Sequence, residues 1–189
     1  MNELEKYIYE YIDIVNVILG TYLDSTWGFD NNKQMIEMSQ YQMRLPIEQL
    51  DNVHFSYGTD NPENPKSVEL HRVTQGEFKQ RNSKNGINYK FIGNMCLISI
   101  YQYWEDYYRD KIAVSKGMKK NDLKSDIMGD LRWLRVSIIH HKGIATKDVE
   151  KCKILKWYRE GDEIFINKEK ILEIISNIVE MLMGLLDIS

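Results

Sequence analysis

The chain carries an arginine and a histidine five positions apart, Arg135 and His140, near the end of one amphipathic stretch. An arginine keeps its charge and binds phosphate through its planar guanidinium group, whereas a histidine can transfer a proton near neutral pH. Cleavage of a phosphodiester bond needs both proton transfer and stabilisation of negative charge. Arg135 and His140 are therefore the first candidates for a chemical site.

A regular apolar repeat predicts that the pair lies on a helix from about Asp122 to His141, with Gly143 as the stop signal after it. The repeat consists of Leu123, Ile127, Leu131, Leu134 and Ile138. These side chains share one narrow stripe, so we expect them to face the core of the protein.

A second face of this helix, on the side of Arg135, is partly apolar and also cationic. A helix with a core stripe and a second semi-apolar face is expected to contact a partner as well as its own core. We therefore expect a homodimer in which the interface on this helix includes Met128, Arg132, Val136 and Ile139.

The two histidines that close the stretch point in different directions. On a regular helix His140 projects roughly 140° from Arg135, and His141 projects close to the core stripe. We expect His141 to be a buried, hydrogen-bonded side chain rather than a catalyst. Arg135 and His140 would converge either if the helix loosens towards Gly143 or if two copies of this face meet across a dyad.

An arginine followed after four to six residues by a histidine, near the end of a helix in a small all-α protein, resembles the RNase motif of the HEPN superfamily. The resemblance covers about residues 89–143. It implies a helical bundle that dimerises along the motif helix and often cleaves RNA without a metal. It also implies a role in a toxin–antitoxin, abortive-infection or other anti-phage system, with an antitoxin or another regulatory protein as a possible partner. Arg135 and His140 take the motif positions, and Val136 stands where the family commonly has a polar residue.

Cleavage of RNA by such a pair needs no cofactor, because the 2′-hydroxyl of RNA is the nucleophile. His140 would act as base or acid at the 2′-oxygen or the leaving oxygen, and Arg135 would stabilise the charged phosphorane. We expect Arg132 and Ser137 to orient the phosphate and Lys142 to bind the flanking backbone. The residues near the motif show no carboxylate–histidine spacing of the kind that is typical of a metal site.

The distribution of charge indicates a polyanionic partner such as RNA. The chain has a net charge of −3, yet residues 116–159 carry twelve Lys and Arg against five Asp and Glu, a balance of +7. Residues 1–70 carry four against twelve, a balance of −8. A basic segment on an acidic protein favours contact with a polyanion through one face, although a solvated charged face is the alternative.

The pattern along the 189 residues predicts a single all-α, HEPN-like helical domain over residues 1–189. Helices are expected at about 3–22, 31–43, 89–113 and 168–186, with a helix break at 24–28. Residues 51–88 are expected to be rich in loops. A small β-hairpin is expected at 153–167, before the last helix, because Arg159-Glu160-Gly161-Asp162 is typical of a turn. An aromatic cluster is expected mainly to pack in the core: Tyr101, Tyr103, Trp104, Tyr107 and Tyr108.

The remaining composition favours a cytoplasmic location. Cys96 and Cys152 form no ligand-like pair and no disulfide framework, which is typical of a reducing compartment. The apolar runs at 14–19 and 171–186 are too short or contain acidic residues, so no membrane association is expected.

The first hypothesis is therefore a metal-independent endoribonuclease. The alternatives are a non-catalytic HEPN-like module that binds RNA or a protein, with Val136 marking the loss of activity, and a helical interaction protein. In the last case Arg135 is a surface cation and His140 complements the dipole at the end of its helix.

Overall fold

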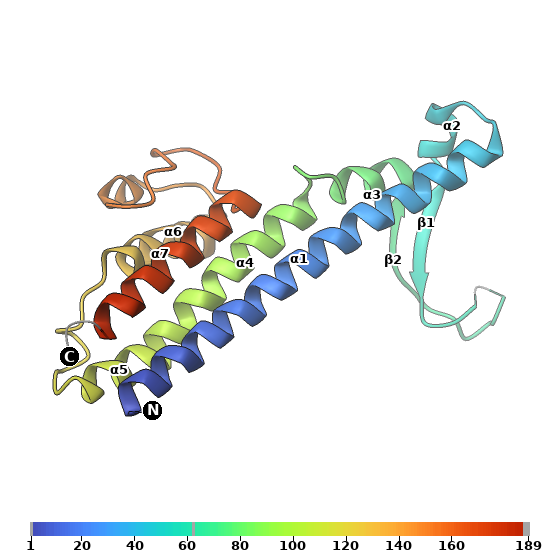
Figure 1. The fold of residues 1–189 in the computed structure, drawn as a ribbon. Helices are drawn as coiled ribbons and strands as arrows, with labels where there is room; N and C mark the ends of the chain where they lie inside the picture. The colour runs from blue at the N-terminus through green and yellow to red at the C-terminus, as the bar shows by residue number, and fades with distance from the viewer. Residues whose placement is uncertain (1, 62, 187–189) are drawn as a thin grey trace. The chain divides into compact units, whose positions relative to one another are not determined.

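A computed structural model describes residues 2–61 and 63–186 (Figure 1). The chain is mostly helical, with 66% helix and 7% strand, which confirms the predicted predominance of helices. It divides into two compact units, one formed by residues 1–23 with 90–189 and the other by residues 24–89. The expectation of a single domain over residues 1–189 stays a prediction.

The first unit is a helical bundle in which α4 lies beside the N-terminal part of α1, α7 lies beside α4, and α6 contacts α7 (Figure 1). Its helices are α1 (Glu3–Met43, of which residues up to 23 belong here), α4 (Ile87–Tyr103, from residue 90), α5 (Arg109–Ser115), α6 (Asp126–His140) and α7 (Lys168–Leu186). The bounds of α7 agree with the prediction. The predicted core stripe of the motif helix is confirmed for four of its five members, because Leu123, Ile127, Leu131 and Leu134 are at most 5% exposed. The fifth, Ile138, is partly buried and packs against this core.

A π-helical turn, Trp104–Tyr108, joins α4 to α5, so the predicted helix at 89–113 has a local change of pitch. The Tyr11 ring of α1 packs against Trp104 and Tyr108, with ring centroids 5.7 and 5.1 Å apart. Tyr101 is also buried, whereas Tyr103 and Tyr107 are both 48% exposed. The prediction that the aromatic cluster packs in the core is therefore right for three of its five members.

Helix α6 begins four residues later than predicted, because Ser125 caps it: the Ser125 hydroxyl accepts a hydrogen bond from the Met128 amide. The helix ends at His140, and His141 is the residue that leaves it. Lys142 and Gly143 then take positive φ angles of 55° and 80°, which stop the helix.

The hairpin predicted at 153–167 is wrong, because the residues on either side of its turn do not pair as strands. The turn forms, with Gly161 at a φ of 91°, but Ile144 and Glu163 form only an isolated bridge. The backbone amides of residues 153–155 instead donate to the buried carboxylate of Asp130, at 2.8, 2.7 and 2.8 Å. The carboxylate of Asp130 on α6 thus accepts the hydrogen bonds that these amides would have donated to a neighbouring strand.

The second unit contains the two strands that the structure describes. β1 (His54–Gly58) and β2 (Glu69–Thr74) pair antiparallel, with His54 opposite Thr74 (Figure 1). Two short helices, α2 (Ile47–Asp51) and α3 (Gln75–Arg81), flank the strands in sequence. The segment expected to be rich in loops, 51–88, therefore holds the hairpin and α3; Pro62 lies outside the described residues.

Helix α1 continues through residues 24–28, so the break predicted there is wrong. The segment from Asp24 to Gly28 suggested the break, yet Gly28 lies in ordinary helical backbone and α1 contains no proline. A single glycine costs a helix only about 1 kcal/mol. Contacts with Tyr89 support α1 at this place: its hydroxyl donates to the Thr26 carbonyl at 2.9 Å, and its ring lies 5.5 Å from that of Phe29.

Within residues 2–61 and 63–186, the structure contains no helix with both the length and the apolar character that crossing a bilayer requires.

Candidate functional site

Two side chains of α4 contact the side chain of Arg135, which lies on α6. Its Nη2 donates a hydrogen bond to Oε1 of Gln102 at 3.0 Å, and its Cζ lies 5.7 Å from the centroid of the Tyr101 ring. The side chain is partly buried, and its Nε atom is buried with no hydrogen-bond partner among the described residues. Arg135 also forms no salt bridge within that part of the chain. Nε of Arg135 is thus a buried cationic donor whose hydrogen bond no acceptor among the described residues takes.

His140 is exposed at the last position of α6. The helix stays regular up to this residue, so the first of the two predicted routes, a loosened helix end, does not bring His140 to Arg135. No hydrogen bond or ring contact joins the two side chains in the described structure. Of the two expectations, the one left is that Arg135 and His140 come from two copies of α6 that meet across a dyad.

His141 is exposed, contrary to the prediction that it is buried. The prediction extended the helical repeat by one residue too many. His141 has a φ of −122° and a ψ of 25°, so its side chain no longer follows the 100° step of α6.

Ser137 cannot orient a phosphate as predicted, because its side chain is fully buried. Its hydroxyl accepts a hydrogen bond from the Thr146 amide at 3.2 Å and lies 3.3 Å from the Thr146 hydroxyl. Ser137 therefore ties α6 to the segment around Thr146. Arg132 and Lys142, the other predicted phosphate ligands, are both exposed.

The predicted dimer face is present only in part. Met128 is 4% exposed and belongs to the core, because α6 turns this side chain towards the bundle rather than to solvent. Arg132 and Ile139 are exposed, the latter to 44%, and Val136 is partly buried. The accessible part of this face therefore consists of Arg132, Val136 and Ile139.

A pocket of about 430 Å³ lies on the same side of α6 as Arg132, in the first unit. The lining includes Tyr101, Glu105, Arg109, Lys124, Gly129 and Arg132. Burial raises the pKa of Glu105, but hydrogen bonds from Arg109 and Lys120 outweigh burial and hold this pKa below its usual range. The carboxylate of Glu105 is therefore charged at neutral pH and already paired with two cations, at 2.9 and 3.0 Å.

Tyr101 connects this pocket with Arg135, a relationship that the sequence did not reveal. Burial and then the charge of Glu105 raise the pKa of Tyr101, whereas Arg132, Arg109 and Arg135 oppose the rise. Three guanidinium groups thus act on one phenol. Helical periodicity placed Tyr101 and Arg109 on one predicted helix, but the packing of that helix against α6 carries no sequence signal.

The second unit contains a second arginine–histidine pair that sequence reasoning missed. Nη1 of Arg81 lies 2.6 Å from Nε2 of His71, and its Cζ lies 5.0 Å from the Phe78 ring centroid. Because a guanidinium can only donate, Nε2 of His71 is the acceptor in this contact. The imidazole is thus held as an acceptor by a permanent cation.

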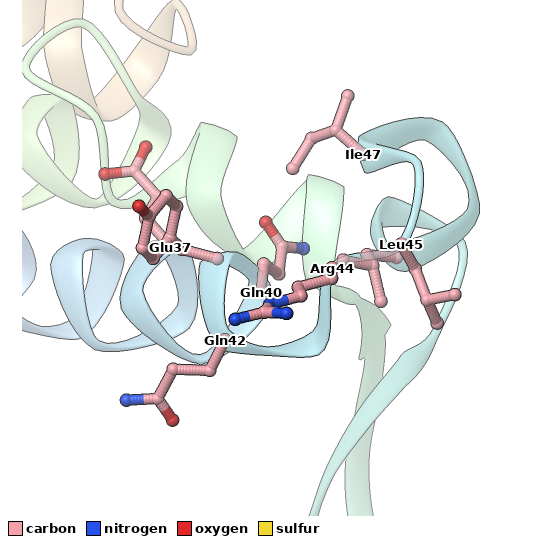
Figure 2. A pocket seen from close by; sticks show the side chains of 8 residues that line it. Glu37, Gln40, Gln42, Arg44, Leu45 and Ile47 are labelled. Carbon is pink, nitrogen blue, oxygen red and sulfur yellow. The ribbon is translucent and has the colours of Figure 1, made fainter.

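The second unit also holds a larger pocket, of about 720 Å³. Figure 2 shows Gln40 and Gln42 at the end of α1, Arg44 and Leu45 on the segment after it, and Ile47 at the start of α2. Gln40 is buried and its amide nitrogen donates to Asp51 and Gln75 at 2.9 Å each, so its polar group is used within the unit. None of the predicted catalytic residues lines this pocket.

The groups that could hold a metal are dispersed in the structure. Among the described residues, no three His, Cys, Asp or Glu side chains come together in a suitable cluster. Cys96 and Cys152 are buried and free, and burial raises their pKa values to about 11 and about 12. Both cysteines are therefore uncharged thiols at neutral pH.

No protein-family model, no curated protein and no solved structure matches this chain. The HEPN resemblance stays a prediction that rests on Arg135, His140 and their helix.

Proposed function

We propose that this protein is a metal-independent endoribonuclease of the HEPN type, with Arg135 and His140 as its catalytic residues. The observation that carries the proposal is the state of Arg135: a partly buried cation, oriented by Gln102 and Tyr101, with an unpartnered buried Nε and no carboxylate partner among the described residues. Burying an uncompensated charge is unfavourable, so such a residue is expected where an anion completes its environment.

In the proposed reaction, His140 accepts the proton of a 2′-hydroxyl while the 2′-oxygen attacks the adjacent phosphorus. The bond from phosphorus to the 5′-oxygen breaks, and this oxygen takes a proton from water or from a second imidazolium. Arg135 stabilises the negative charge of the phosphorane through its guanidinium donors. The products are a 2′,3′-cyclic phosphate and a 5′-hydroxyl, and no step is an oxidation or a reduction.

Two copies of α6 would supply the complete site. Since His140 lies at the end of a regular helix, the Arg135 of one copy and the His140 of another meet only if the helices pack across a dyad. Arg132, Val136 and Ile139 form the accessible surface for this contact. A dimer would also supply two imidazoles, one as base and one as acid.

We place this activity in the cytoplasm, in a toxin–antitoxin or other anti-phage role with an antitoxin or other regulatory protein as partner. The basic balance of residues 116–159 supports RNA as the polyanion that the protein binds.

The test is cleavage of RNA by purified variants. Arg135→Ala and His140→Ala should each abolish cleavage, and Arg135→Lys should recover little, because a point charge does not reproduce the planar fork. His141→Ala is the matched control, since His141 is the neighbouring exposed histidine. Full activity of His140→Ala, combined with loss of activity in a normally folded His141→Ala, would mean that His141 and not His140 carries the catalysis.

The second candidate function is a non-catalytic module that binds RNA or a protein, and Val136 favours it. RNA binding by the wild type without any cleavage, lost in Arg135→Ala, would support this second function and contradict the first.

A further inference from the structure

We infer that the pocket lined by Arg132, Arg109 and Tyr101 is a subsite for a phosphate of the RNA strand beside the scissile phosphate. This inference rests on the proposed function for the identity of the ligand. It assigns a role to a cavity whose lining includes Arg132 but neither of the catalytic residues.

The charge of the pocket favours an anion. Its one lining carboxylate among the described residues, Glu105, is paired with Arg109 and Lys120. Lys124 and Arg132 also line the pocket, and neither forms a salt bridge in the described part of the chain. Two cations that are free of acidic partners there thus face a cavity whose acid is already compensated, which is the arrangement expected for binding a phosphate.

The pocket also offers a neutral hydrogen-bond donor. Tyr101 is 8% exposed, and its hydroxyl forms no hydrogen bond with the described residues. The opposing effects of Arg132, Arg109 and Arg135 on the pKa of Tyr101 show that all three guanidinium groups act on this ring. A phosphate oxygen beside the hydroxyl would receive a hydrogen bond within the field of these groups.

The position of Tyr101 makes the pocket a neighbour of the proposed catalytic arginine. Tyr101 lines the pocket, and Cζ of Arg135 lies 5.7 Å from the centroid of its ring. The volume of about 430 Å³ falls in the range of about 300–1,000 Å³ that is usual for small-molecule sites, so it admits a phosphate with part of its nucleoside. A strand cleaved at Arg135 would thus place another of its phosphates here.

Gly129 allows a test of the pocket that leaves every charge in place. A Cβ added at Gly129 meets nothing within 4 Å, so Gly129→Leu fills the cavity without a clash at its first atom. Gly20→Leu in α1 is the matched control, because Gly20 is also helical, is surrounded by open space and lines none of the described pockets. Both changes remove a helix glycine, so both proteins should melt at or above the wild-type temperature.

The probe is a 2′-O-methylated oligoribonucleotide, which lacks the nucleophile and reports binding alone. Gly129→Leu should weaken its binding about tenfold, the effect of losing one charge-assisted hydrogen bond, while Gly20→Leu binds as the wild type does. Arg132→Gln should reduce the slope of log affinity against log salt by about 0.7, the value for one phosphate on a single strand. Wild-type affinity of Gly129→Leu together with an unchanged slope for Arg132→Gln would overturn the inference, as would failure of the wild type to bind the probe at low salt.

The same variants separate this inference from the proposed function. Pocket-dependent binding of the probe without cleavage of unmodified RNA would retain the subsite and reject the nuclease. Cleavage of RNA at the wild-type rate by Gly129→Leu, with unchanged probe binding, would retain the nuclease and reject the subsite.

Discussion

The guanidinium of Arg135 in α6 donates from Nη2 to Oε1 of Gln102 in α4, across 3.0 Å. A neutral amide therefore orients this cation, where a carboxylate would have neutralised it. Gln102 in turn donates to the carboxylate of Asp106, which fixes the direction of its amide. The arginine keeps its full charge for a ligand while its position is fixed by the helix beside it.

Replacing this neutral acceptor by a charged one should impair the site without unfolding the protein. Gln102→Glu keeps an oxygen for Arg135 but adds a carboxylate that competes with phosphate, so RNA affinity and cleavage should both fall about tenfold. Gln42→Glu, the same change at an exposed position of α1, is the control. Equal loss in both variants would mean that net charge alone, and not the environment of Arg135, sets the affinity.

The dimer contact should depend on Ile139, which is 44% exposed on α6. Ile139→Asp adds a charge to the accessible part of the predicted interface, and sedimentation should shift towards monomer. Val114→Asp is the control, since Val114 is 63% exposed on α5. A wild-type profile for Ile139→Asp would exclude this face as the contact between two copies.

Asp130 should be the acidic residue of α6 whose loss affects stability most. It is 2% exposed and accepts three backbone hydrogen bonds from residues 153–155. Asp130→Ala leaves these amides without an acceptor, so the free energy of unfolding in urea should fall by about 3 kcal/mol or more. Asp148→Ala, which removes an exposed side chain paired with Lys151, should change the free energy of unfolding by less than about 0.5 kcal/mol. Equal effects of the two changes would contradict the role given to Asp130.

From the ion pairs of Glu105 we predict how the stability of the folded protein depends on pH. Its pKa is lower in the folded protein than in the unfolded chain, so its contribution is complete above about pH 5 and is lost as pH falls through the folded-state value. The melting temperature of Glu105→Gln should therefore lie below that of the wild type at pH 7, and the difference should shrink below about pH 4. Glu160→Gln, at an exposed position, is the control. A difference that grows in acid would contradict the pairing of Glu105 with Arg109 and Lys120.

Local patterns predicted the elements whose apolar repeat is continuous. The core stripe of α6 and the bounds of α7 followed from periodicity, because each helix buries one regular face. The hairpin at 153–167 could not be excluded in this way, since the acceptor for its amides, Asp130, lies more than twenty residues earlier. The strands at 54–58 and 69–74 went unpredicted, and most of their residues are exposed, so neither strand has a continuous buried face.

The candidate site shows the same division. Arg135 and His140 are identifiable from spacing alone, and so is the helix that carries them. The partners of Arg135, Tyr101 and Gln102, lie on α4, more than thirty residues earlier, and only the packing of α4 against α6 brings them to it. The burial of Ser137 and the exposure of His141 likewise depend on where α6 ends and on how the chain turns at Lys142 and Gly143.

The chemistry of the product ends tests the proposed function most directly. RNA incubated with the wild-type protein in EDTA should be cut to fragments that carry a 2′,3′-cyclic phosphate and a 5′-hydroxyl, as read by mass spectrometry. A single 2′-deoxy nucleotide at the cleavage position should block the cut, because it removes the nucleophile. Fragments with a 3′-hydroxyl and a 5′-phosphate, or cleavage that EDTA abolishes and Mg²⁺ restores, would contradict the proposal.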